Sequence, residues 1–116
     1  MGTPHVQQLD ATIAVAPQLA PEDLAWAANA GYRSVINNRP DFEGGPDQPT
    51  SAQIEAAAKA AGLAYAFLPV ASGYQSPEEI ERFAQLLQTL PKPILAFCRS
   101  GTRSGRLVGA ARDLRR

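Results

Sequence analysis

The chain has 116 residues, 45% of them hydrophobic and 19% charged, which is typical of one globular domain with a single core over residues 1–116. Eleven basic and eleven acidic residues cancel, so no overall field attracts nucleic acid or an anionic membrane, and neither partner is expected. One cysteine and one histidine are too few for the usual cysteine and histidine zinc sites, and no metal or organic cofactor is predicted.

The first half of the sequence predicts alternating strands and helices. Residues 6–15 mix apolar and polar side chains and predict one or two short strands, which Pro17 ends. Proline and two acidic residues at positions 21–23 favour a first helical turn, and Gly31 should stop that helix. A strand is expected at residues 34–37.

A long loop is predicted over residues 37–50, because NNRPDFEGGPDQPT carries three prolines, two glycines and no apolar period. Its length in a compact domain makes it a candidate functional loop. Thr50 and Gln53 fit a capping box for a helix that runs to about Ala61 and stops at Gly62. Residues 64–68 predict another buried strand.

The last part of the chain predicts a helix that begins at Ser76-Pro77, a strand at residues 94–97 and a final helix from Arg103 onward. Strands that alternate with helices indicate an α/β fold, with a mostly parallel central sheet flanked by helices. Ligands of such sheets bind beyond the carboxyl ends of strands, and Cys98 lies at one of those ends.

The loop from Cys98 to Ser104 has the composition of an anion site. Backbone N–H groups between a strand and a helix can point at one anion, and the helix dipole adds to their effect. The expected anion-binding residues are Arg99, Ser100, Gly101, Thr102, Arg103 and Ser104. Cysteines at helix N-termini or beside arginine ionise readily, so Cys98 is predicted to be a nucleophilic thiolate. The alternative is a buried apolar cysteine at a strand end.

The sequence CRSGTRS resembles the loops of two enzyme families, the rhodanese-like sulfurtransferases and the cysteine phosphatases with the signature HC-x5-R-[ST]. The stretches VINNRPDFEGGP, LAYAFLPV and PKPILAFCRSGTRS resemble the DUF442 family over about residues 6–114. That family is also described as the phosphatase-like domain of beta-lactamase-hydrolase-like proteins. The resemblance implies a catalytic domain with a cysteine-phosphatase-like topology of the dual-specificity type.

Two departures from the phosphatase signature favour sulfur transfer. Only four residues separate Cys98 from Arg103, which is the rhodanese-like spacing, and Phe97 stands where phosphatases have histidine. We therefore expect a sulfurtransferase that moves sulfane sulfur through a Cys98 persulfide to a thiol or cyanide acceptor. Its donor would be a small sulfur-containing anion or persulfide, guided by Arg99 or Arg103. The family implies a sulfide-oxidising enzyme as a possible partner.

Two other functions remain open. The first alternative is a protein tyrosine or dual-specificity-like phosphatase, which hydrolyses a phosphate ester through a Cys98 phosphocysteine and needs a general acid. Asp41 resembles the aspartate on the mobile loop of phosphatases, with Glu43 and Asp47 as substitutes, although an aspartate in such a loop also fits a simple turn. The second alternative is a non-catalytic anion-binding module.

No apolar run of about 18 residues or more occurs, so no membrane span is expected. Residues 1–5 lack the charged and then apolar layout of a signal peptide. The expected location is therefore cytoplasmic.

Overall fold

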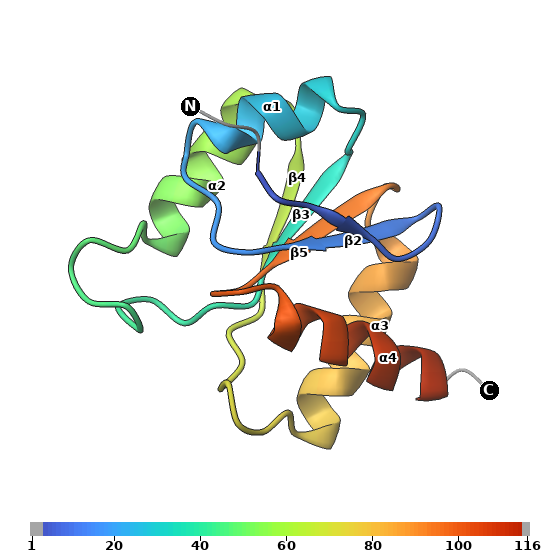
Figure 1. Cartoon of the computed structure of the whole chain (residues 1–116). Coiled ribbons are helices and arrows are strands. Elements are labelled where there is room, and N and C mark those ends of the chain that lie inside the picture. The colour runs from blue at the N-terminus through green and yellow to red at the C-terminus, as the bar shows by residue number, and fades with distance from the viewer. Residues whose placement is uncertain (1–3, 115–116) are drawn as a thin grey trace.

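The computed structural model describes residues 4–114, which form a five-stranded sheet between two layers of helices (Figure 1). The elements in chain order are β1 Gln7–Gln8, β2 Ile13–Ala16, α1 Asp23–Asn29, β3 Ser34–Asn37, α2 Ser51–Ala60, β4 Ala64–Phe67, α3 Pro77–Thr89, β5 Ile94–Phe97 and α4 Thr102–Leu114. The predicted α/β fold with a mostly parallel sheet is confirmed. None of the helices in residues 4–114 combines the length and apolar character needed to cross a membrane.

The strand order is β1-β2-β5-β3-β4, and only the β1–β2 pair is antiparallel. β5 lies between β2 and β3, where Phe97 is in register with Ala16 on one side and Asn37 on the other. All four β5 residues are buried, as expected of a central parallel strand covered on both faces. The carboxyl ends of β2, β5 and β3 therefore meet at one edge of the sheet, directly before Cys98.

Side chains of β5 alternate between the two layers of the core. Ile94 and Ala96 pack with apolar residues of α3 and α4, whereas Leu95 and Phe97 pack with those of α1 and α2. This alternation follows from the two-residue period of a strand. Each face of the sheet is thus closed by two helices, which leaves its carboxyl edge as the place where loops gather.

Two capping boxes begin the helices α2 and α3. Thr50 Oγ1 accepts a hydrogen bond from the Gln53 N–H at 3.2 Å, and Gln53 Oε1 accepts one from the Thr50 N–H at 2.9 Å. Ser76 and Glu79 form the same pair of bonds at 3.1 and 2.8 Å, with Pro77 as the first residue of α3. These bonds satisfy N–H groups that have no partner within a helix, and the predicted helix starts are confirmed.

The structure differs from the sequence expectations at two helix starts. Pro21 lies in a turn closed by a hydrogen bond from the Asp23 N–H to the Ala20 carbonyl at 2.9 Å, and α1 begins only at Asp23. The Asp23 carboxylate accepts the Ala20 N–H at 2.8 Å, so the acidic residue holds this turn. The last helix begins at Thr102, one residue earlier than predicted.

A side chain would be strained and tightly packed at Gly101, whereas Gly109 has space for one. Gly101 has φ +93°, and a Cβ there would lie 3.3 Å from the Ala16 carbonyl carbon. Gly101→Ala should lower the free energy of unfolding by about 1–3 kcal/mol. A Cβ added to Gly109, in α4, would meet nothing within 4 Å, and Gly109→Ala should raise that free energy by about 0.5–1 kcal/mol. Urea denaturation measures both, and equal shifts in one direction would contradict this account.

Candidate active site

The site begins with Cys98, the first residue after β5, and continues into the start of α4 at Thr102. The Cys98 side chain is buried, and its Sγ accepts a hydrogen bond from the Gly101 N–H at 3.1 Å. The positive φ of Gly101, a conformation that other residues disfavour, accompanies this inward turn of the backbone. A thiolate accepts such a bond better than a thiol, and it lies at the positive end of the helix dipole.

Arg103 is held beside the cysteine by bonds to two other segments. Its side chain is buried, with Nη1 donating to the Val70 carbonyl at 3.0 Å and Nη2 donating to Glu43 Oε1 at 3.1 Å. Its Nε is buried and has no hydrogen-bond partner within residues 4–114. A buried donor without a partner is costly, so this guanidinium is suited to an anion that accepts from Nε.

Polar contacts fix the position of the loop against β3. Ser104 is fully buried, and its Oγ donates to Asn38 Oδ1 at 2.8 Å. Asn38 Nδ2 in turn donates to the Leu68 carbonyl at 3.1 Å. The predicted loop residue Ser104 therefore positions the start of α4, and the structure does not place it on the wall of the cavity.

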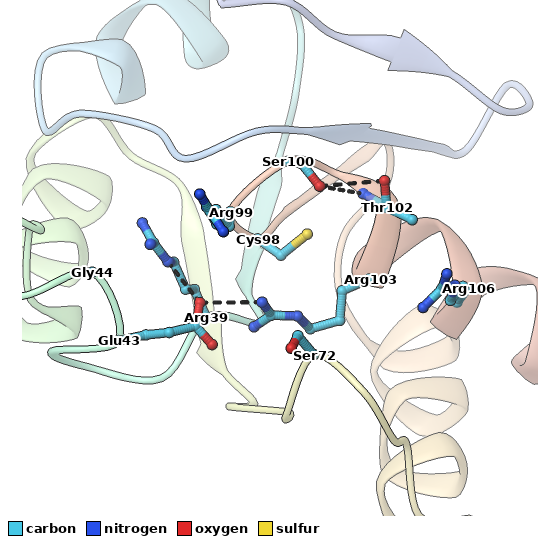
Figure 2. A pocket seen from close by; sticks show the side chains of 10 residues that line it. All are labelled: Arg39, Glu43, Gly44, Ser72, Cys98, Arg99, Ser100, Thr102, Arg103 and Arg106. Carbon is cyan, nitrogen blue, oxygen red and sulfur yellow. Dashed lines mark hydrogen bonds and ion pairs between the residues drawn. The ribbon is translucent and has the colours of Figure 1, made fainter.

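A cavity of about 760 Å³ opens in front of the cysteine (Figure 2). Its lining residues are Arg39, Glu43, Gly44, Ser72, Cys98, Arg99, Ser100, Thr102, Arg103 and Arg106. Four guanidinium groups and one carboxylate give this lining a net charge of three positive units, four minus one. No aromatic or large aliphatic side chain is among these residues. The chain as a whole is neutral, so the positive charge is concentrated at this site.

Glu43 is the carboxylate of the cavity and bridges two of its arginines. Its Oε1 accepts from Arg39 Nε at 2.9 Å and from Arg103 Nη2 at 3.1 Å, as Figure 2 shows. Burial raises the pKa of Glu43, but the hydrogen bonds and charges of Arg103 and Arg39 outweigh burial and hold this pKa below its ordinary value. Glu43 is thus an ionised group that occupies part of the anion-binding fork of Arg103.

The loop after β3 is folded tightly enough to fix Glu43. Phe42 has φ +65°, and a Cβ on Gly44 would approach Arg39 Nη2 to 2.6 Å. Gln48 Oε1 accepts from the Gly44 N–H at 2.7 Å, and Gln48 Nε2 donates to the Pro40 carbonyl at 2.8 Å. These contacts support a conformation of the loop in which its carboxylate faces the cysteine loop.

Asp41, the general acid predicted for the phosphatase alternative, contacts the start of α2 in this structure. Its Oδ1 accepts the Ser51 N–H at 2.7 Å, at the first residue of α2. Neither Asp41 nor Asp47 lines the cavity, whereas Glu43 does. The structure thus brings Cys98 together with Glu43, which the sequence indicated only as a substitute.

Most of the predicted loop residues meet at one cavity, and sequence reasoning missed two other arginines. Cys98 and its neighbours at positions 99, 100, 102 and 103 line the cavity, and Gly101 bonds the sulfur. Arg39 and Arg106 were not expected. Arg106 follows Arg103 by three residues, a spacing that places two side chains on one helix face, and this signal was available in the sequence. For Arg39 the signal was its place just beyond the end of β3.

The family model described as "Beta-lactamase hydrolase-like protein, phosphatase-like domain" matches residues 5–113. Beta-lactamase hydrolase-like proteins from Agrobacterium fabrum strain C58 and Xylella fastidiosa strain 9a5c are 39% identical over 93 residues and 36% identical over 100 residues. These alignments cover 80% and 86% of this chain but only 21% and 23% of the relatives. The chain therefore spans less than a quarter of the length of these relatives.

A solved candidate phosphatase from Neisseria meningitidis Z2491 is 36% identical, with a TM-score of 0.82 over 89% of this chain and 72% of that chain. A PP-IP phosphatase core domain from S. cerevisiae, in complex with citrate, has a TM-score of 0.73 at 16% identity, over 97% and 67% of the two chains. The kinase-associated phosphatase, with its catalytic cysteine replaced by serine, has a TM-score of 0.68 at 12% identity, over 95% and 75%. The expected cysteine-phosphatase topology is confirmed.

Replacing Glu43 with glutamine should tighten binding of inorganic phosphate by about tenfold, or ~1.4 kcal/mol, because a competing negative charge leaves Arg103. The pKa of Glu43 lies below its ordinary value of 4.5, so the group stays ionised and the difference should persist from about pH 8 to about pH 5.5. Calorimetric titration measures it. Glu55→Gln is the matched control, since Glu55 pairs with Lys59 away from the cavity. Equal affinity of Glu43→Gln and wild type would disprove the competition.

Proposed function

The chain belongs to the family of phosphatase-like domains of beta-lactamase hydrolase-like proteins, and from this membership and the geometry of its cysteine loop we propose that it is a cysteine-dependent phosphatase. This replaces sulfur transfer as the leading function, because the comparisons support the phosphatase alternative better. The observation that carries the proposal is the unpartnered Nε of Arg103, a buried donor within a cationic cavity that Cys98 also lines.

The proposed reaction uses Cys98 as the nucleophile and Arg103 as a ligand of the phosphoryl group. The Cys98 thiolate attacks phosphorus, so that an S–P bond forms while the bond from phosphorus to the leaving oxygen breaks, and water then hydrolyses the phosphocysteine. The backbone N–H groups at the start of α4 and the guanidinium of Arg103 stabilise the charge on the phosphoryl oxygens. Displacement of Glu43 frees Nη2, so Arg103 can present Nε and Nη2 side by side to the anion.

The missing histidine before the cysteine has a structural explanation. Phe97 is fully buried and packs with the apolar residues of α1 and α2. The strand end is therefore fixed by core packing. The nucleophile keeps its place through the strand register and through its bond from Gly101.

Cys98→Ser should abolish hydrolysis of p-nitrophenyl phosphate, with a loss of at least about a thousandfold in kcat/KM, because no covalent intermediate can form. Arg103→Lys should lower kcat/KM by about a hundredfold, because lysine keeps the charge but not the parallel N–H pair. Arg82→Lys, at an exposed position of α3, is the control. Acid quench and intact mass should find a phosphoryl group on wild type alone. Activity of Cys98→Ser near the wild-type level would refute the proposal.

Sulfur transfer remains a second candidate because of one observation, the four residues between Cys98 and Arg103. In this reaction the thiolate attacks the outer sulfur of a persulfide, a new S–S bond forms, and the old S–S bond breaks with its electron pair leaving on the donor thiolate. This leaving group needs no proton.

Incubation with glutathione persulfide separates the two functions. Sulfur transfer predicts a mass gain of one sulfur atom on wild type, its removal by an acceptor thiol, and no gain on Cys98→Ser. An unchanged mass, with a thiol that iodoacetamide still alkylates, would eliminate this candidate.

A further inference from the structure

We propose that the substrate of this site is a phosphoanhydride, in which the transferred phosphoryl group is joined through oxygen to a second phosphate. This inference rests on the proposed phosphatase function and names its substrate class. Two independent features carry it, the lack of a proton donor in the cavity and the distribution of its arginines.

The first feature concerns the leaving group. An alkyl phosphate releases an alkoxide, which needs a proton from a general acid. Glu43 is the one carboxyl group among the described residues that line the cavity, and Arg103 and Arg39 hold it ionised. Its ion pair with Arg39, at 2.9 Å, does not depend on Arg103 and can persist when an anion displaces Glu43 from Arg103. Asp41 is engaged with the Ser51 N–H. Ser72 comes from the segment 68–76, which contains no acidic residue. A leaving group that departs as a stable anion avoids this requirement.

The second feature concerns charge. Arg103 suffices for the transferred phosphoryl group, yet Arg39, Arg99 and Arg106 line the same cavity. Arg99 and Arg106 are exposed, and their side chains have no hydrogen-bond or ion-pair partner in residues 4–114. They lie on either side of Cys98 in Figure 2, one before and one after the helix start. Their unpaired charges suit a second anionic group next to the one that reacts.

Aryl phosphates also release a stable anion, but the lining offers a ring only stacking on guanidinium groups, with no aromatic or large aliphatic side chain beside it. Phe42 and Tyr74 are 69% and 67% exposed, and neither lines the cavity. A phenyl ring would therefore meet arginine, serine and threonine side chains where a second phosphate would meet complementary charge. The combination of missing acid, excess positive charge and polar lining selects the anhydride.

The chemical step balances without another reactant. The Cys98 sulfur bonds to the terminal phosphorus, and the bridging P–O bond breaks with its electron pair on the oxygen of the departing phosphate. Water then attacks the phosphocysteine, the S–P bond breaks, and inorganic phosphate and the Cys98 thiolate are released, with the proton of water passing to phosphate or solvent. The arginines neutralise charge on the departing phosphate throughout.

The test compares three probes in the presence of a metal chelator: inorganic tripolyphosphate, p-nitrophenyl phosphate and glycerol 2-phosphate. Phosphate release should give the highest kcat/KM for tripolyphosphate and a value at least about a hundredfold lower for glycerol 2-phosphate. Arg106→Gln should raise KM for tripolyphosphate by about tenfold and KM for p-nitrophenyl phosphate several times less. Arg82→Gln, exposed on α3, should change neither value.

The outcomes separate this inference from the proposed function. Hydrolysis of glycerol 2-phosphate at a rate close to that of tripolyphosphate, or a preference for p-nitrophenyl phosphate over tripolyphosphate, would overturn the anhydride and leave a Cys98-dependent phosphatase. An equal effect of Arg106→Gln on both substrates would also overturn it. Release of phosphate from none of the three probes would overturn both proposals.

Discussion

The placement of β5 between β2 and β3 is the constraint on which the site depends. Parallel pairing on both sides leaves Phe97 no freedom of register, and the next residue is the nucleophile. The chain then turns at Gly101, where a Cβ would make a tight contact with the Ala16 backbone, and enters α4. A buried strand, a glycine turn and a helix start therefore fix the sulfur, the N–H groups and Arg103 in one rigid unit.

The protein itself balances part of the positive charge of the cavity when no ligand is bound. Arg39 and Arg103 share the Glu43 carboxylate, which comes from a loop about 60 residues earlier in the chain than Arg103. Two buried or half-buried guanidinium groups without this partner would repel each other in a medium of low dielectric constant. Glu43 thus stabilises the empty site, and the same contact raises the cost of binding any other anion there.

The sequence predicted the elements with strong local signals and the chemistry that lies within one segment. Ser76 and Thr50 mark helix starts through side-chain hydrogen bonds that span three residues, and CRSGTRS is one continuous segment. The helix starts and the cysteine loop could therefore be predicted from local sequence. The sequence did not predict the position of Asp41 or the role of Glu43. These two carboxylates are two residues apart in the sequence. The folding of their loop around Gln48 places Asp41 at the start of α2 and Glu43 beside Arg103. Contacts of this kind depend on tertiary structure, which no local spacing encodes.

The bond from the Gly101 N–H to the sulfur also bears on how the site tolerates oxidants. Cys98 is the one cysteine in these 116 residues, so a sulfenic acid formed on it has no neighbouring thiol in this sequence with which to close a disulfide. Recovery of an oxidised site then relies on a thiol from another molecule or another part of a longer chain, or on condensation of the sulfenic acid with a backbone nitrogen. Such a partner thiol has to reach the buried sulfur through the cavity that Cys98 lines.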